Sequence, residues 1–206
     1  VRGVACDQPA CAFVAFERAK KNRHEFISPE HLLYALTYDS VAADVLFHCG
    51  ADVVALRDDC GFPGMRILQF AFGDDAHNNF LLHRHVPNTV VYTGTHDNDT
   101  TLGWWASTSE RERRFAGQYL GAQAADIHWA MIRAACNSVA KLAIFPLQDV
   151  LGMGAAHRMN TPGKMDDNNW SWRFDWAMVG DEHGEALGRV TAASGRAPIG
   201  LLRLPV

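Results

Sequence analysis

The spacing of apolar residues changes near residue 60 of this 206-residue chain. Before that point apolar side chains recur every three to four positions, as at Phe16 and Ala19, which is typical of helices with one buried face. Ser28 stands in front of a proline as an expected N-cap, and Gly50 is an expected helix stop. The pattern predicts an all-α segment of four short helices over residues 1–58.

Short apolar runs alternate with longer amphipathic stretches after residue 60. This alternation is typical of strand and helix units that build a parallel sheet. The pattern predicts strands over residues 65–70, 88–92 and 141–145. It predicts helices over residues 100–106, 109–120, 125–140 and 182–193, with a helical turn over 149–153.

The longest predicted helix carries a clear packing stripe. Ile127, Met131, Ala134 and Ala135 recur at helical spacing, which favours a face packed on the core. A tail that contains glycine and proline follows the last helix. We therefore divide the chain into residues 1–58, 59–195 and 196–206.

Composition and charge argue against several classes of function. A net charge of −4 with scattered basic residues gives no concentrated positive face for nucleic acid or an anionic membrane, while 48% hydrophobic residues are ample for a core. No apolar run is long enough to span a membrane or to form a secretory signal. Five irregularly spaced cysteines favour reduced thiols and a cytoplasmic protein. Because the chain starts at Val1, we expect an internal fragment.

Polar, charged and aromatic side chains are concentrated directly after the second predicted strand, over residues 95–105. Polar residues at the end of a parallel strand are typical of active sites in barrels and open sheets. In one interpretation, Asp97 and Asp99 only cap the helix that follows. In the other, the flat faces of Trp104 and Trp105 beside these carboxylates indicate a sugar-binding cleft, and the indole pair favours this interpretation.

Four motifs in the same order connect residues 51–195 to a known family. They are Gly-Phe-Pro-Gly-Met-Arg-Ile-Leu-Gln-Phe-Ala-Phe at 61–72, Val-Tyr-Thr-Gly-Thr-His-Asp-Asn-Asp-Thr-Thr-Leu-Gly-Trp-Trp at 91–105, Pro-Leu-Gln-Asp-Val-Leu-Gly at 146–152, and Arg-Met-Asn-Thr-Pro-Gly at 158–163 with Asn-Trp-Ser-Trp-Arg at 169–173. This part resembles the C-terminal third of bacterial 4-α-glucanotransferases, the amylomaltase family. The resemblance implies an α/β fold, a partial (β/α)8 barrel with three parallel βα units equivalent to strands six to eight, and a malto-oligosaccharide ligand.

The family transfers α-1,4-glucan segments by a retaining mechanism that uses a nucleophilic Asp, an acid/base Glu and a second Asp that stabilises the transition state. An oxocarbenium-like transition state needs a proton donor on one side and a carboxylate on the other. The resemblance gives Asp97 the stabilising role and gives His96 a role in holding the same sugar. It also places Phe70, Asp74 and Asn160 in neighbouring subsites, whereas the residues alone favour a core position for Phe70 and a turn for Asn160.

The other two catalytic carboxylates have no match in the chain. In the family both lie upstream, and the acid/base belongs to a Glu-Asp-Leu-Gly motif. The corresponding positions 44–47 read Asp-Val-Leu-Phe, in a stretch predicted as helix, and no segment matches that of the nucleophile. We therefore expect a 4-α-glucanotransferase-like segment that is inactive alone, with an open sheet face that promotes self-association.

Residues 10–57 resemble a different family. The stretches Phe-Glu-Arg-Ala-Lys at 16–20 and Arg-His-Glu-Phe-Ile-Ser-Pro-Glu-His-Leu-Leu-Tyr-Ala-Leu at 23–36 are similar to one repeat of the N-terminal domain of Clp-type unfoldases. That resemblance implies binding of an adaptor or peptide, and makes His24 and His31 structural or surface residues. Two alternatives stay open, a Clp-type binding module and a chimera without selected function. We expect neither a metal nor a cofactor.

Overall fold

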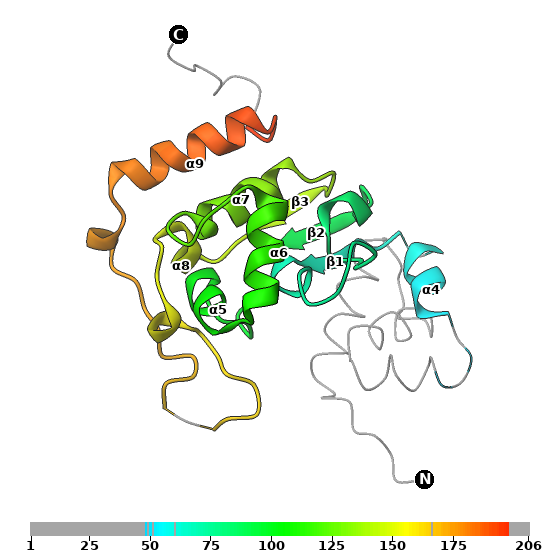
Figure 1. Cartoon of the computed structure of the whole chain (residues 1–206), viewed down its shortest axis with the longest axis horizontal. Coiled ribbons are helices and arrows are strands. Elements are labelled where there is room, and N and C mark those ends of the chain that lie inside the picture. The colour runs from blue at the N-terminus through cyan, green and yellow to red at the C-terminus, as the bar shows by residue number, and fades with distance from the viewer. Residues whose placement is uncertain (1–47, 49, 51, 60, 166, 198–206) are drawn as a thin grey trace, which may run out of the picture. The chain divides into compact units, whose positions relative to one another are not determined.

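The structure is a computed structural model that describes residues 48, 50, 52–59, 61–165 and 167–197 (Figure 1). Its backbone contacts divide the chain into two compact units, residues 1–64 and 65–206. In the first unit, α4 (Val53–Asp59) lies, except for its last residue, within the segment 1–58 that is predicted to be helical. The other predicted N-terminal helices, positions 44–47, most of the Clp-like segment and the end of the tail lie outside the described residues.

Three short strands form a parallel sheet in the order β1-β2-β3. They are β1 (Gly64–Ile67), β2 (Thr89–Tyr92) and β3 (Leu142–Ile144). Val91 of β2 lies opposite Ala143 of β3 in the parallel register. The sheet confirms the predicted α/β class and its parallel arrangement.

The first strand is shorter than predicted. It ends at Ile67, and a 3-10 turn over Leu68–Phe70 replaces the rest of the expected strand. Leu68 and Gln69 are both buried. Neighbouring residues of a strand point to opposite faces, so a strand that is covered on one side cannot bury both side chains. The turn brings both into the interior.

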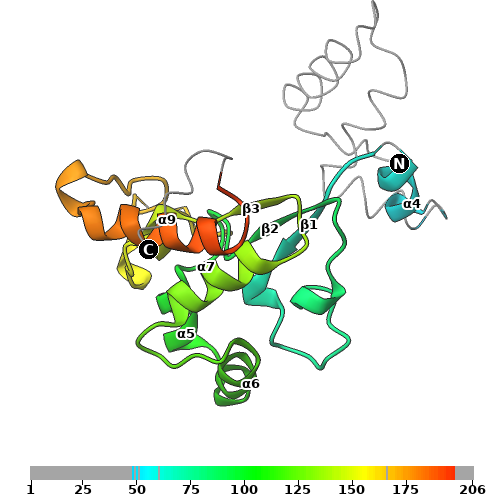
Figure 2. The ribbon, with the colours of Figure 1, turned by 90° about the horizontal axis from the view of Figure 1, so that it is seen from above.

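Helices of the second unit cover one face of the sheet, and Figure 2 shows α5, α6 and α7 on the same side of it. The helices are α5 (Thr101–Ser107), α6 (Glu110–Leu120), α7 (Ile127–Asn137), α8 (Leu147–Val150) and α9 (Asp181–Ala193). Short 3-10 turns lie at Leu82–Arg84, Ala155–His157 and Trp176–Met178. Within the described part of the chain, every helix is too short or too polar to cross a membrane.

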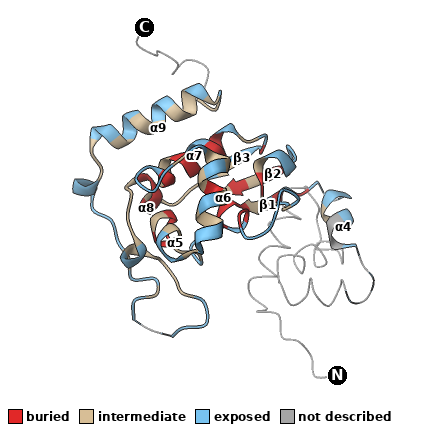
Figure 3. Cartoon of the chain, viewed as in Figure 1, coloured by how far each residue is buried: buried red, intermediate tan, exposed pale blue. Residues whose placement is uncertain are grey.

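Helix α7 lies at the centre of the core (Figure 3). Its predicted stripe is confirmed, because Ile127, Met131, Ala134 and Ala135 are all buried. Burial extends further round the helix than the stripe predicts, to Ala130, Ile132 and Cys136. The reason is that α5 and α6 pack against α7 together with α8, α9 and β3.

Arg196, beyond the end of α9, caps the carboxyl end of α7 through hydrogen bonds. Its guanidinium donates hydrogen bonds to the main-chain oxygens of Cys136 at 2.6 Å, Ala140 at 2.7 Å and Ser138 at 2.9 Å. The last carbonyls of a helix have no partner within the helix, so a cation there satisfies them. These hydrogen bonds hold the segment after α9 against the end of α7.

The uncovered face of the sheet carries exposed apolar side chains. Met65 of β1 is 54% exposed, and Leu142 and Ile144 of β3 are 52% and 46% exposed. Leu142 and Ile144 share a face because they are two positions apart on one strand. The described residues therefore leave open the sheet face whose exposure the partial barrel predicts.

Candidate active site

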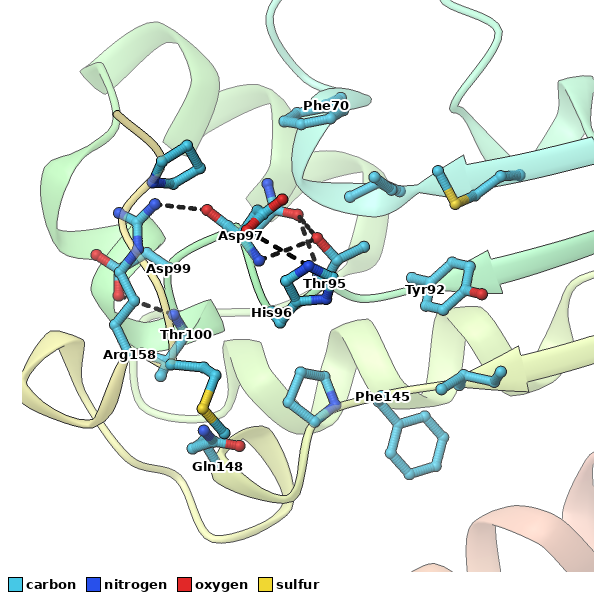
Figure 4. A pocket seen from close by; sticks show the side chains of 18 residues that line it. Phe70, Tyr92, Thr95, His96, Asp97, Asp99, Thr100, Phe145, Gln148 and Arg158 are labelled. Carbon is cyan, nitrogen blue, oxygen red and sulfur yellow. Dashed lines mark hydrogen bonds and ion pairs between the residues drawn. The ribbon is translucent and has the colours of Figure 1, made fainter. Parts of the chain in front are cut away.

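A cavity of about 750 Å³ lies at the carboxyl ends of the three strands (Figure 4). Its floor is apolar and consists of strand residues such as Met65, Ile67 and Tyr92. Its polar wall comes from the segment 93–100, which we call the β2–α5 loop, and from residues 158–162. In open parallel sheets, ligands bind at this edge.

The β2–α5 loop is folded by its own side chains and by Gln69. Asn98 Oδ1 accepts hydrogen bonds from the Thr95 main-chain N at 2.9 Å and from Thr95 Oγ1 at 2.8 Å. Gln69 Nε2 donates to the Asp99 main-chain oxygen at 2.8 Å. Gly94 permits this approach, because a Cβ atom there would lie 2.7 Å from Gln69 Nε2. These contacts fix the main chain on both sides of Asp97.

Asp97 is held from three directions. Its Oδ1 accepts a hydrogen bond from Asn160 Nδ2 at 2.6 Å, and His96 Nε2 lies 3.4 Å from the same oxygen. Its main-chain oxygen accepts from Arg158 Nη2 at 2.5 Å, and Arg158 Nε donates to the Asn160 main-chain oxygen at 2.7 Å.

The two carboxylate oxygens of Asp97 have different surroundings. Among the described residues Oδ2 has no hydrogen-bond partner, and the side chain is 48% exposed. The site thus presents a carboxylate with one oxygen fixed and one oxygen available to a ligand hydroxyl. A charged acceptor of this kind makes stronger hydrogen bonds than a neutral one.

Helix capping does not explain Asp97. The N-cap of α5 is Thr100, whose hydroxyl accepts a hydrogen bond from the Gly103 main-chain N at 3.1 Å. Asp99 makes a local bond, in which its Oδ1 accepts from the Thr100 N at 2.8 Å. The capping interpretation is therefore wrong for Asp97, whose carboxylate contacts Asn160 and His96 instead.

A buried carboxylate joins the two ends of the β2–α5 loop. Asp149 Oδ2 accepts hydrogen bonds from Thr93 Oγ1 at 2.6 Å and Thr101 Oγ1 at 2.8 Å, and its Oδ1 accepts from the Thr101 N at 2.7 Å. Asp149 is 1% exposed. Burial raises the pKa of Asp149 above its ordinary value of 3.8, although the bonds from Thr93 and Thr101 act in the opposite direction.

Phe70 lines the cavity together with His96 and Asp97. Phe70 is 50% exposed and packs edge-to-face on Phe80 at 5.6 Å, so it does not occupy the core position that the residues alone favoured. Asp74 is exposed and lies outside the set of cavity-lining residues. Its Oδ2 accepts a weak hydrogen bond from Asn78 Nδ2 at 3.4 Å.

The two indoles of α5 do not reach the cavity. Trp104 and Trp105 are half-buried and pack against the hydrophobic core, with Trp104 5.8 Å from Phe72 between ring centroids. Neither lines the cavity, which corrects the expectation of indole faces beside the carboxylates. The physical reason is that both belong to a helix whose inner side covers the core.

Three positions that hold the site were not predicted individually: Gln69, Asp149 and Arg158. Each lies inside a motif quoted for the family resemblance, which was the available signal. Their partners are 30 to 61 residues away along the chain. Contacts over that separation depend on how the loops come together, which residue spacing does not encode.

The fold and the cavity define a class of α/β proteins that carry their ligand site at the carboxyl ends of parallel strands. The match to known proteins is more specific. The chain belongs to the 4-alpha-glucanotransferase family, whose model matches residues 23–178.

Relatives with the name 4-alpha-glucanotransferase share substantial identity with the chain. The Synechocystis protein is 48% identical over 147 residues, which is 70% of this chain and 29% of that protein. The Thermus thermophilus protein is 43% identical over 153 residues, which is 70% of this chain and 30% of that protein. The Clostridium butyricum protein is 34% identical over 187 residues, which is 87% of this chain and 38% of that protein. The chain thus spans less than two fifths of the length of these relatives.

A solved structure supports the fold. The amylomaltase from Streptococcus agalactiae in complex with acarbose superposes with a TM-score of 0.70 at 24% identity, over 84% of this chain and 36% of that chain. The family match begins at residue 23 and so overlaps the segment that resembles a Clp repeat. The Clp-type module, the chimera and the cytoplasmic location stay predictions.

Proposed function

We propose that the cavity binds α-1,4-glucan segments and forms one wall of a 4-α-glucanotransferase site. Asp97 carries this proposal, because its carboxylate stands at the carboxyl end of β2 with one oxygen fixed by Asn160 and the other open to the cavity. Family membership supports the choice of ligand.

The chemistry follows from the position of Asp97. As a glucose ring distorts toward an oxocarbenium ion, positive charge develops and hydrogen bonds to ring hydroxyls strengthen. A pre-positioned carboxylate stabilises that state more than the relaxed substrate, since it does not have to reorganise. His96 and Phe70 line the same cavity and supply a polar and an apolar contact for the sugar.

Titration calorimetry with maltoheptaose tests the binding. We expect wild-type protein to bind, and Asp97→Ala to weaken the affinity at least about tenfold, because a hydrogen bond to a charged group contributes roughly 1.5–3 kcal/mol. Asp181→Ala, on an exposed carboxylate of α9 outside the cavity, is the matched control with unchanged affinity. A wild-type protein without binding heat contradicts the proposal.

We further propose that this chain alone does not transfer glucan. It carries Asp97 but no match for the nucleophile, and positions 44–47 read Asp-Val-Leu-Phe in place of the acid/base motif. Loss of either group lowers turnover by several orders of magnitude. Incubation with maltotriose should release no glucose above a buffer control. Glucose release that Asp97→Ala abolishes would overturn this expectation.

A further inference from the structure

Trp170 has an unusual main-chain conformation. It is the one non-glycine residue with a positive φ, 62°, in the part of the chain that the structure describes. A side chain on an L-residue crowds the backbone in this region, so large residues rarely adopt it. Both main-chain polar groups hold it in place: the Trp170 N donates to the Met159 oxygen at 2.8 Å, and Arg173 Nη1 donates to the Trp170 oxygen at 2.9 Å.

This conformation places the indole beside the cavity. The ring centroid of Trp170 lies 5.1 Å from that of His96, with 39° between the ring planes. His96, which contacts the indole ring, and Met159, which accepts from the Trp170 main-chain N, both line the cavity. Trp170 therefore stands at the rim, next to the polar wall that carries Asp97.

Apart from its ring contact with His96, the indole of Trp170 makes no aromatic or hydrogen-bond contact among the described residues. It is 55% exposed, and its Nε1 has no hydrogen-bond partner there. Trp172, two positions later, differs on both points, since it is half-buried and its Nε1 donates to His157 Nδ1 at 3.1 Å. A strained backbone that exposes a large apolar ring is typical of a ligand contact rather than of packing.

The chemistry of the ring fits a sugar. A pyranose has an apolar C–H face that packs on an aromatic ring, and hydroxyl groups at its edge that accept a hydrogen bond from an indole N–H. We propose that Trp170 forms an outer glucan subsite at the rim of the cavity, which contacts the glucose unit that follows those bound near Asp97. This inference rests on the proposed function.

An outer subsite makes binding depend on the length of the glucan. A short oligosaccharide that occupies only the cavity does not reach Trp170, whereas a longer chain gains the additional contact. An aromatic contact of this type changes affinity by about threefold to tenfold. Trp170 is thus a residue that determines preference for longer malto-oligosaccharides.

Titration calorimetry on the whole chain, with maltotriose and maltoheptaose as ligands, tests this inference. We expect Trp170→Ala to lower the affinity for maltoheptaose about threefold to tenfold, and that for maltotriose by less than about twofold. Trp176→Ala is the matched control, because this indole is 77% exposed but has its ring contact with Phe174, away from the cavity residues.

The variant Trp170→Gly distinguishes the effect of losing the indole ring from the effect of the strained backbone. Glycine adopts a φ of 62° without strain, so this variant should keep or raise the midpoint of thermal unfolding while losing affinity as Trp170→Ala does. Wild-type binding with unchanged affinity in Trp170→Ala overturns the outer subsite and leaves the glucan site intact. An equal loss for both ligands also overturns it. Absence of binding by the wild-type protein overturns both proposals.

Discussion

Asp149 shows how one buried side chain can fix a site that it does not line. Its carboxylate accepts hydrogen bonds from Thr93, directly after β2, and from Thr101, the first residue of α5. The β2–α5 loop lies between these two residues, so the distance between the loop ends is set by a single carboxylate. We interpret Asp149 as a positioning residue for Asp97.

Removal of this carboxylate should destabilise the protein. Asp149→Ala leaves three buried donors without a partner, and each such group costs roughly 1–3 kcal/mol, so we expect the free energy of unfolding to fall by about 3 kcal/mol at pH 7. Asp149→Asn should lower the free energy of unfolding by less. Its amide oxygen still accepts from the Thr101 N, and the hydroxyls of Thr93 and Thr101 can rotate to accept from the amide NH2. Urea denaturation measures both. A fall of less than about 1 kcal/mol for the Ala variant would show that the contacts are dispensable.

Wild-type protein and the Asp149→Asn variant should differ in how their free energy of unfolding depends on pH. Burial raises the pKa of Asp149 in the folded state above 3.8, so the folded state takes up the proton before the unfolded state does. The part of the stability that depends on protonation of Asp149 is therefore fully present below pH 3.8 and is lost as pH rises through the folded pKa. Wild-type protein should gain stability relative to Asp149→Asn as pH falls toward 3.8, in urea titrations at several pH values.

Single residues of the site were predictable to an unequal degree. His96, Asp97 and Phe70 could be placed in one cavity because the family motifs contain them, and Asn160 joins them through its bond to Asp97. The indoles of Trp104 and Trp105 were assigned to the site from their nearness in sequence. On a helix, nearness in sequence does not give a common direction, and packing on the core decided their place.

At the scale of elements, the spacing of apolar residues was the most reliable guide to which side of a helix is buried. The stripe on α7 follows from helical spacing alone, because a helix packed on a core repeats every 3.6 residues. The end of β1 could not be predicted, since a short apolar run does not distinguish a strand from a strand followed by a turn. The bonds that Arg196 makes to the end of α7 connect segments nearly 60 residues apart and left no periodic signal.

The exposed face of β3 should make the protein self-associate. Leu142 is 52% exposed on the open face of the sheet and does not line the cavity. Burial of such a side chain contributes roughly 1.5–3 kcal/mol, so Leu142→Glu should weaken association at least about tenfold in sedimentation velocity over a concentration series. Val139→Glu, 58% exposed just before β3, is the matched control. Equal association of both variants would place the contact elsewhere.

At the scale of the whole molecule, the sheet positions the site and leaves it one-sided. The parallel order β1-β2-β3 brings the ends of three strands to one edge, where the β2–α5 loop and residues 158–162 meet. The alternation of strands and helices was sufficient to predict that arrangement. The contact between the two loops was not predictable, because Arg158 and Asp97 are 61 residues apart.

An NMR titration of ¹⁵N-labelled protein with acarbose tests whether the cavity beside Asp97 binds a glucan analogue, because it reports both binding and its location. We expect amide shift changes in the β2–α5 loop and in residues 158–162, little change in α6, and loss of the effect in Asp97→Ala. A spectrum without changes, or changes in wild type that Asp97→Ala does not reduce, would contradict it.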